Sequence, residues 1–228
     1  RSPDGRWVSE VGERAEGLAG VSDSIVSDMV ALGMPEHKMQ VLRNGVDLER
    51  FKPLPDRAQL RAQWGMHRFT AVSVGSLIPR KCHEVTIRAL ARLPDVDLVI
   101  AGEGPERERL MALSRELGLQ ARVRLLGSVP HDQLVGLYNA ADVSVLASFH
   151  EGLANALLEA IACGVPLIAT NVDGAPEVLD DPRAGVMVPV GDAGAIARAL
   201  HAMRLSAPSR AEVRASAERF DWAATTDA

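Results

Sequence analysis

From residue 69 onward, short runs of β-branched and other apolar residues alternate with stretches whose apolar residues recur at helical spacing. This alternation is typical of βα units, in which helices bury both faces of a parallel sheet. The apolar runs predict six strands, at 70–74, 96–101, 123–126, 143–147, 165–169 and 186–188. The intervening patterns predict helices at 83–93, 105–117, 132–140, 153–163, 175–179 and 193–203. The sequence therefore predicts an α/β fold with a Rossmann-like doubly wound parallel sheet.

The segments on either side of this repeat have a different pattern. A helix near 23–32 and the apolar pair Val41–Leu42 precede a proline-bearing stretch, which is typical of a domain end followed by a linker. We interpret residues 1–52 as the end of an N-terminal domain and a crossover linker, residues 53–205 as the Rossmann-like domain, and residues 206–228 as a C-terminal helix and tail. Because Arg1 is not a natural start, we expect the sequence to be part of a longer protein.

The bulk composition excludes several classes of function. Apolar residues make up 47% and charged residues 24% of the chain, which is the balance of a globular protein. A net charge of −5 offers no basic surplus for a nucleic acid partner. There is no long apolar run or signal pattern, and Cys82 and Cys163 are the two cysteines, so we expect a cytoplasmic location. Membrane association is expected only through a part of the protein outside this sequence.

Loops that follow parallel strands form the usual ligand site of an open α/β sheet. In the loop 75–81, Gly75 permits a close approach of ligand to backbone, and Arg80 or Lys81 can place a cation over a phosphate. An ordinary turn with two solvated cations remains the alternative. The loop 101–105 holds two glycines, but their spacing is short for a dinucleotide fingerprint, so the signal for a phosphate site is weak.

The loop at 151–160 carries the most informative pattern. Gly152 and Ala154 open a predicted helix, whose free N–H groups and positive dipole end attract an anion such as a pyrophosphate. Glu151 precedes this helix and Glu159 lies about one and a half turns inside it, so we expect the carboxylates on either side of the phosphates. One could bind a ribose diol and the other a sugar hydroxyl. The spacing itself is not specific, because Glu108 and Glu116 have it too.

Residues 151–170 resemble the E-x7-E signature region of the retaining glycosyltransferases called group 1 or family 4. Other segments of the sequence are similar to recurring sequence blocks of this family, and they occur in the same order along the chain. They are 21–22, 44–47, 51–53, 75–81, 102–105, 127, 141–143 and 174–178. The resemblance implies the GT-B architecture, in which two Rossmann-like domains face each other across a cleft. This chain is similar to the C-terminal domain, which holds most of the donor.

The resemblance implies a nucleoside diphosphate sugar, a UDP- or GDP-sugar, as donor substrate and no cofactor. By position, Lys81 would contact the donor diphosphate, Glu151 the transferred sugar and Glu159 the ribose hydroxyls. Lys81 and Glu151 are therefore the candidate catalytic residues. Val129 would lie at the edge of the base, and backbone groups from 152 to 156 would complete the site. The further donor-binding candidates are Gly75, Ser76, Arg80, Gly102, Gly152, Leu153, Ala154, Asn155 and Ala156.

Two departures from the family pattern concern the site. Ser76 stands where many members have an arginine, and Arg80 is the candidate to compensate. The glycine-rich loop and histidine of the family's N-terminal domain have no counterpart here. We therefore expect a saccharide or lipid-linked acceptor, as in polysaccharide or glycoconjugate biosynthesis, to bind to the missing domain. Because half of the cleft would be absent, we expect this chain alone to be inactive.

No metal site is predicted, since His83, His131 and His201 are scattered and no Asp-x-Asp sequence is present. The resemblance implies metal-independent transfer with retention, by attack on the front face of the sugar while the leaving phosphate takes the acceptor's proton. Two alternatives remain open at this point. One is a nucleotide-sugar epimerase of the same fold, and the other is a nucleotide-sugar-binding module without turnover.

Overall fold

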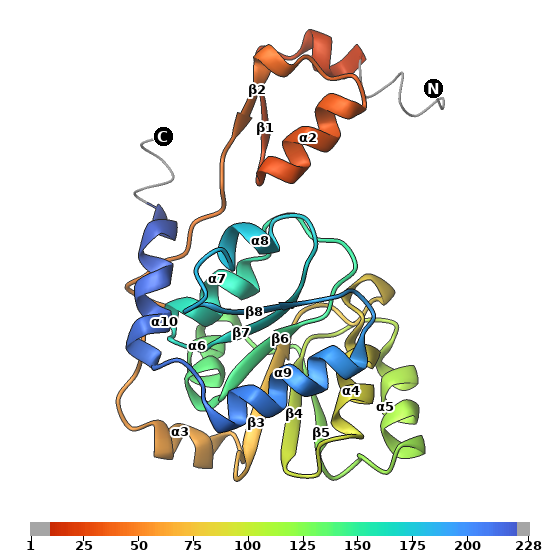
Figure 1. The fold of residues 1–228 in the computed structure, drawn as a ribbon, viewed down its shortest axis with the longest axis vertical. Coiled ribbons are helices and arrows are strands. Elements are labelled where there is room, and N and C mark those ends of the chain that lie inside the picture. Colours follow the sequence, from red (N-terminus) through yellow and green to blue (C-terminus); the bar gives the residue numbers. More distant parts are fainter. Residues whose placement is uncertain (1–9, 223–228) are drawn as a thin grey trace.

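The computed structural model describes residues 10–222, so the parts of the predicted end segments at 1–9 and 223–228 lie outside the described residues. Its centre is a parallel sheet of six strands in the order β5-β4-β3-β6-β7-β8 (Figure 1). The strands are β3 (Phe69–Val74), β4 (Val96–Ala101), β5 (Val123–Gly127), β6 (Val143–Leu146), β7 (Leu167–Thr170) and β8 (Gly185–Val188). The predicted α/β fold with a Rossmann-like doubly wound sheet is confirmed.

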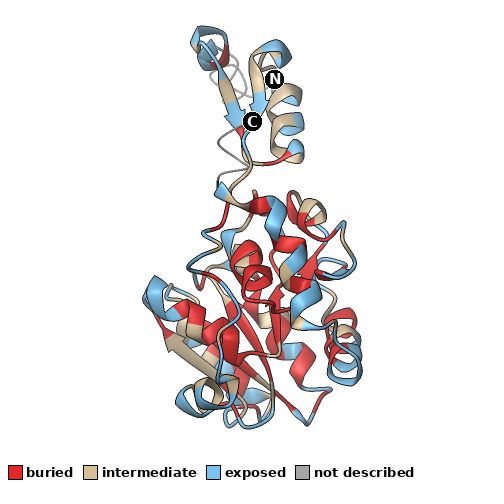
Figure 2. Cartoon of the chain, turned by 90° about the vertical axis from the view of Figure 1, so that its left-hand side faces the viewer, coloured by how far each residue is buried: buried red, intermediate tan, exposed pale blue. Residues whose placement is uncertain are grey.

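Helices cover both faces of this sheet. One face packs against α4 (His83–Leu90), α5 (Arg107–Glu116) and α9 (Ala193–Leu205). The other packs against α3 (Arg57–Gln63), α6 (His131–Ala140), α7 (Asn155–Ala162), α8 (Ala175–Val178) and α10 (Arg210–Ala217). Successive strand residues point to opposite faces of the sheet. Ala71 therefore packs on the face covered by α4, α5 and α9, and Val72 packs on the opposite face. Figure 2 shows that the central strands of the sheet are mostly buried, whereas β5 and β8 at its two edges are partly exposed.

At three elements of the sheet domain the start differs from the sequence prediction by two residues. The strand predicted at 165–169 begins at Leu167, because the N–H of Val165 donates to Ala160 and closes the end of α7, while Pro166 has no N–H. The helices predicted from 105 and 153 begin at Arg107 and Asn155. Helix α3 was not predicted, since its seven residues are too few for a periodic pattern.

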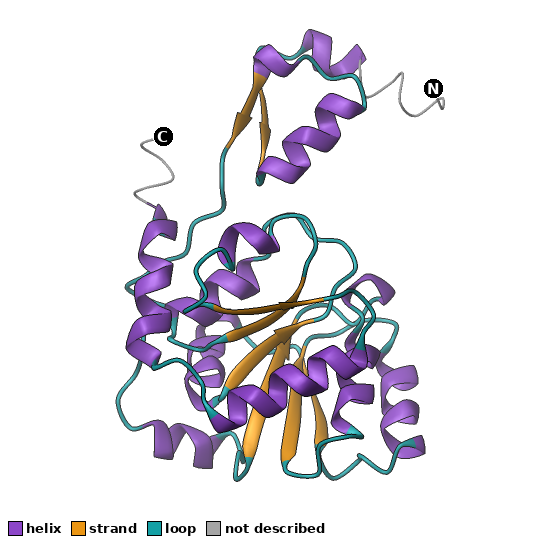
Figure 3. Cartoon of the chain, in the orientation of Figure 1, coloured by secondary structure: helices purple, strands orange, loops and turns teal. Residues whose placement is uncertain are grey.

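The N-terminal segment forms a small unit of its own, drawn above the sheet in Figure 3. It contains β1 (Leu18–Gly20), α2 (Asp23–Ala31), and β2 (Met39–Val41), with β1 and β2 paired in parallel. Ser22 caps α2 by accepting a hydrogen bond from the N–H of Ile25 at 3.3 Å. The helix predicted near 23–32 corresponds to α2, and the apolar pair at 41–42 lies at the end of β2. Strand β1 was not predicted.

Arg214 of α10 joins three distant parts of the chain. Its guanidinium donates hydrogen bonds to the carbonyls of Phe51 at 2.6 Å, Ala162 at 2.7 Å and Leu48 at 3.0 Å. Leu48 and Phe51 lie in the segment that leads from the N-terminal unit to the sheet, and Ala162 is the last residue of α7. The side chain therefore fixes both the crossing segment and α10 to the end of α7.

Arg214→Leu should lower the free energy of unfolding by about 2–3 kcal/mol, because the substitution leaves three backbone carbonyls without their charged donor. Urea denaturation followed by circular dichroism measures this loss. The control is Arg204→Leu in the exposed last turn of α9, which should change stability by less than about 0.5 kcal/mol. Equal losses in the two variants would contradict the joining role of Arg214.

Candidate functional site

The loops that follow β3 and β4 interlock at the carboxyl edge of the sheet. The N–H of Gly75 donates to Ala101 at 3.0 Å, and the N–H of Leu77 donates to Glu103 at 2.8 Å. A Cβ atom at Gly102 would lie 1.9 Å from the carbonyl oxygen of Gly75. This contact between loops accounts for the glycine at position 102 without a phosphate, in line with the weak signal of its sequence.

A cavity of about 330 Å³ opens where β3, β4 and β5 end. Its volume falls at the lower end of the usual range for small-molecule sites, roughly 300–1,000 Å³. Four of the predicted site residues line it, and these are Gly75, Ser76, Gly102 and Val129. The residue predicted to meet a nucleotide base therefore shares one cavity with the loops after β3 and β4.

A second group of predicted residues gathers around Glu151, whose side chain is 7% exposed. Lys81 forms an ion pair with this carboxylate, and the Nη1 atom of Arg80 lies 3.3 Å from its Oε2 atom. The hydroxyl of Ser148 donates to Oε1 at 2.7 Å. Arg80 also donates to the carbonyl of His150 at 2.8 Å. Two cations from the loop after β3 thus meet one carboxylate from the loop after β6.

Asp173, in the loop after β7, holds the backbone of this group. Its Oδ2 atom accepts the N–H of Glu151 at 2.5 Å and lies 2.8 Å from Nδ1 of His150. Sequence reasoning singled out neither Asp173 nor Ser148. Both follow strands of the same parallel sheet, so the rule that ligands bind beyond the carboxyl ends of strands could have included them.

Helix α7 begins at Asn155, which leaves Gly152 and Leu153 in the loop before it. The crossing segment reaches this loop through Asn44, whose amide donates to the carbonyl of Leu153 at 2.8 Å and to Oδ1 of Asn155 at 2.9 Å. The N-cap residue Ala154 has no side-chain acceptor, so the N–H groups of Asn155 and Ala156 are not capped by it. The start of α7 thus has the donors that suit an anion.

Glu159 has partners different from those of Glu151. Its Oε1 atom lies 2.9 Å from Nε2 of His131, and its Oε2 atom accepts from the hydroxyl of Tyr138 at 3.1 Å. Burial raises the pKa of Tyr138 well above its ordinary value, and the Glu159 charge adds to the rise, so the hydroxyl keeps its proton as a donor. Glu159 lines a cavity of about 250 Å³ together with His131 and Asn155.

The family model described as "Glycosyl transferases group 1" matches residues 56–220, which is more than half of the chain. The chain belongs to the group 1 glycosyltransferases. D-inositol 3-phosphate glycosyltransferases of Mycobacterium bovis and Mycobacterium tuberculosis are each 35% identical to it, over 99% of this chain and 50% of theirs. The chain therefore spans about half the length of these curated relatives.

Solved structures agree with this assignment. The crystal structure of Anabaena HepE in complex with UDP-glucose has a TM-score of 0.90 and 25% identity, covering 98% of this chain and 65% of that one. Sucrose-phosphate synthase from Thermosynechococcus elongatus has a TM-score of 0.85 and 26% identity, covering 99% and 59%. The group 1 chain thus has the fold of the C-terminal half of GT-B glycosyltransferases, and the resemblance seen in its sequence is confirmed.

Neither a metal centre nor a membrane span is found in the described part of this group 1 chain. Within residues 10–222, no group of three or more His, Cys, Asp and Glu side chains is placed to hold a metal ion. Over the same residues, no helix combines the length and the apolar composition that crossing a membrane requires.

His83 holds the loop that follows β3, the first loop of the candidate site. Its ring is buried at the start of α4, with Nδ1 3.1 Å from the hydroxyl of Ser73 and Nε2 3.3 Å from the carbonyl oxygen of Ser76. Burial lowers the pKa of His83, although the nearby carbonyls of Ser76 and Gly75 oppose the change. The ring is therefore neutral at pH 7, and its two nitrogens join β3 to the loop after it.

The lowered pKa of His83 makes stability dependent on pH. Below about pH 6.5 the unfolded chain binds a proton that the folded chain resists, so stability should fall as the pH falls. Between pH 6.5 and 5.5 this group should remove at most about 1 kcal/mol. Urea denaturation at the two pH values should show a smaller loss in His83→Gln, which does not titrate. Parallel losses in both proteins would refute the assignment to His83.

Proposed function

We propose that this chain binds a nucleoside diphosphate sugar, and that the whole protein transfers the sugar to an acceptor with retention of configuration and without a metal ion. The observation that carries the proposal is the meeting of Lys81 with Glu151 just before the uncapped start of α7. A lysine ammonium and a helix N-terminus together form a site for a diphosphate. The carboxylate beside them suits a sugar hydroxyl.

The donor would take over contacts that the charged groups of the site make with one another. A diphosphate competes with Glu151 for Lys81, because both are anions that pair with the same ammonium. Once Lys81 pairs with the diphosphate, Glu151 is free to accept a hydrogen bond from the transferred sugar. When the bond from sugar to phosphate breaks, the charge that develops on the leaving diphosphate is stabilised by Lys81, Arg80 and the N–H groups of α7.

The nucleoside end has two candidate contacts. The cavity at Val129 would take the base, and Glu159 would accept hydrogen bonds from the ribose hydroxyls. Since Tyr138 and His131 hold both oxygens of Glu159, the carboxylate is already oriented for this role. The UDP-glucose complex of Anabaena HepE supports a UDP-sugar as the first donor to test, with a GDP-sugar as the alternative.

The remaining parts of the proposal concern the whole protein. Residues 1–52 would end the N-terminal domain, residues 53–205 would hold the donor, and residues 206–228 would form the C-terminal helix and tail. A saccharide or lipid-linked acceptor would bind to a part of the whole protein outside this chain. That part would correspond to the half of the relatives that this chain does not span. Retention by front-face attack is the outcome implied by the family. Nuclear magnetic resonance of the product made by the whole protein would test it, because an inverted anomeric centre would contradict this mechanism.

Lys81→Ala should weaken the affinity of residues 1–228 for UDP by about tenfold or more, because a charge-assisted contact contributes on the order of 1.5–3 kcal/mol. Isothermal titration calorimetry gives both affinities. The matched control is Lys52→Ala, which removes a half-exposed ammonium 3.3 Å from the exposed carboxylate of Glu49. A surface pair of this kind contributes little, so the control should bind UDP as the parent chain does. An equal loss in both variants would exclude Lys81 from the diphosphate site.

The two glutamates should differ in their effect on nucleotide binding. Glu159→Gln should weaken UDP binding about tenfold, because the ribose hydroxyls lose a charged acceptor. Glu151→Gln should leave UDP affinity unchanged or higher, since Lys81 no longer has a carboxylate competing for it. The same variant should lower the turnover of UDP-glucose in the whole protein. Calorimetry and a transfer assay measure the two effects.

The control for this pair of variants is Glu116→Gln at the exposed end of α5, since Glu116 has the same eight-residue spacing from another glutamate. It should change neither UDP affinity nor turnover. If Glu151→Gln and Glu159→Gln weaken UDP binding equally, the proposed division between sugar and ribose contacts is wrong.

A further inference from the structure

Three residues other than glycine have a left-handed backbone between residues 10 and 222. They are Asp56, Cys82 and Asp173, with φ of 57°, 48° and 42°. This region is unfavourable for residues with a side chain, which persist there only where the surrounding structure holds them. Cys82 directly follows Lys81, and Asp173 contacts the backbone of Glu151. Two of the three therefore lie where the two candidate catalytic residues meet.

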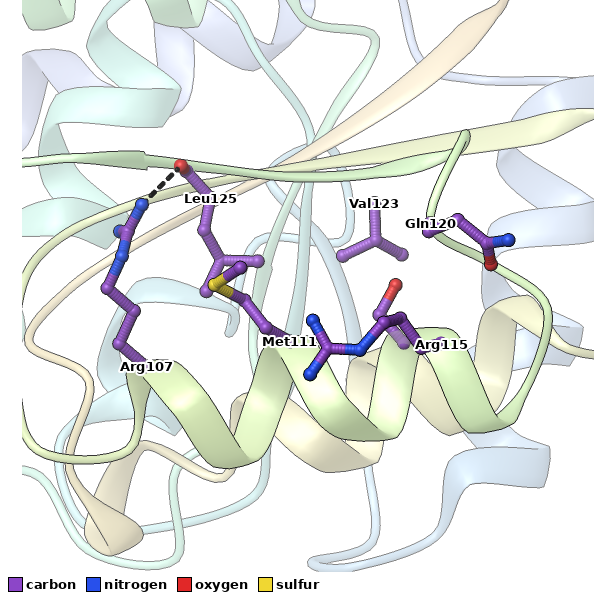
Figure 4. Close-up of a pocket in the computed structure, with 7 residues that line it drawn as sticks. Arg107, Met111, Arg115, Gln120, Val123 and Leu125 are labelled. Atoms are coloured by element: carbon purple, nitrogen blue, oxygen red, sulfur yellow. Dashed lines mark hydrogen bonds between the residues drawn. The ribbon is translucent and has the colours of Figure 1, made fainter.

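The cavity between α5 and β5 lacks this feature (Figure 4). Its volume is about 280 Å³, and residues of the helix and the strand line it together with Gln120. None of these lining residues has a positive φ. The dashed line in Figure 4 marks the hydrogen bond from Arg107 to the carbonyl of Leu125, at 3.3 Å, which joins the regular helix to the regular strand. Left-handed residues thus mark the edge of the donor site and do not accompany every cavity.

Asp173 differs from Asp56 in what its carboxylate contacts. The Oδ2 atom of Asp173 accepts the N–H of Glu151 at 2.5 Å and lies 2.8 Å from Nδ1 of His150. The side chain of Asp173 is 15% exposed, so these contacts are shielded from water. Asp56 is exposed and makes no side-chain hydrogen bond to the helix that it precedes. Glycine would form the turn at 173 without strain, so the carboxylate, and not the turn, accounts for the aspartate.

Two further hydrogen bonds align the same two segments. The hydroxyl of Thr170 donates to the carbonyl of Ser148 at 2.5 Å. The N–H of Gly174 donates to the carbonyl of Gly152 at 3.0 Å. These bonds lie on either side of the aspartate contact along the chain, so the segment after β7 holds the loop after β6 at three points.

We propose that Asp173 is a positioning residue for the contact between Glu151 and the transferred sugar, an inference that rests on the proposed binding of a nucleoside diphosphate sugar. The carboxylate of Asp173 holds the N–H of Glu151 and so fixes the backbone from which that side chain reaches the sugar. A diphosphate takes Lys81 from Glu151, but the contact with Asp173 is made to the backbone and does not depend on Lys81. Asp173 therefore keeps Glu151 in place when its cation moves to the donor.

Asp173→Gly separates the carboxylate from the turn, because glycine adopts the left-handed backbone without strain. The variant should keep the circular dichroism spectrum and the cooperative unfolding of the parent chain. Calorimetric titration of residues 1–228 with UDP and with UDP-glucose gives two affinities. The variant should bind UDP-glucose about fivefold more weakly and UDP unchanged, because only the sugar contact depends on the placement of Glu151.

Two matched variants serve as controls. Asp173→Asn keeps an oxygen that can accept the N–H of Glu151 and tolerates the left-handed backbone, so it should bind UDP-glucose as the parent chain does. Asp56→Gly makes the same exchange at a left-handed aspartate outside the site and should change neither affinity. Equal losses for UDP and UDP-glucose in Asp173→Gly would overturn the positioning role, since they would show a general disturbance of the site.

A measurement without any donor separates this inference from the proposed function. Amide hydrogen exchange of Glu151, followed by nuclear magnetic resonance, should be faster in Asp173→Gly than in the parent chain, because the N–H loses its acceptor. Unchanged exchange would overturn the holding contact itself. If the parent chain binds neither UDP nor UDP-glucose, the proposed function fails and this inference fails with it. If the parent chain binds both and Asp173→Gly binds both equally well, the proposed function stands and the role of Asp173 is refuted.

Discussion

Parallel pairing of six strands brings all of their carboxyl ends to one edge of the sheet, and the candidate donor site depends on this constraint. Lys81 follows β3, Val129 follows β5, Glu151 follows β6 and Asp173 follows β7. These positions span more than ninety residues of sequence. No local element holds them together, because each loop is positioned by its strand and each strand by its neighbours.

Charged side chains gather at the same edge of the sheet, and each buried charge there needs a compensating partner. Burial of a single carboxylate is unfavourable unless cations and hydrogen-bond donors compensate for the lost water. Glu151 has Lys81, Arg80 and Ser148 around it, so its negative charge is balanced by groups of the chain itself. A site of this kind favours ligands that bring their own anion, since only they can replace Glu151 at the cations.

The fold and the outline of the site were predictable because they depend on local pattern. Strand length, helical periodicity and the order of motifs fix the βα units and the E-x7-E loop. The partners of Glu159 were not predictable, because His131 and Tyr138 meet it through the packing of α6 on α7. Asp173 was missed for a similar reason, since its contact with Glu151 joins two loops through tertiary structure. Helix α3 is too short to give a periodic signal.

The segment that leads from the N-terminal unit to the sheet lies beside residues 220–222. Val46 pairs in parallel with Asp221, its N–H donates to the carbonyl of Phe220 at 2.7 Å, and a Cβ at Gly45 would lie 2.7 Å from the ring of Trp222. Two consecutive residues of the crossing segment, Gly45 and Val46, thus lie against residues 220–222. Any side chain at Gly45 would push these two segments apart at the start of the path to the sheet, because its Cβ would also lie 2.9 Å from the backbone of Trp222.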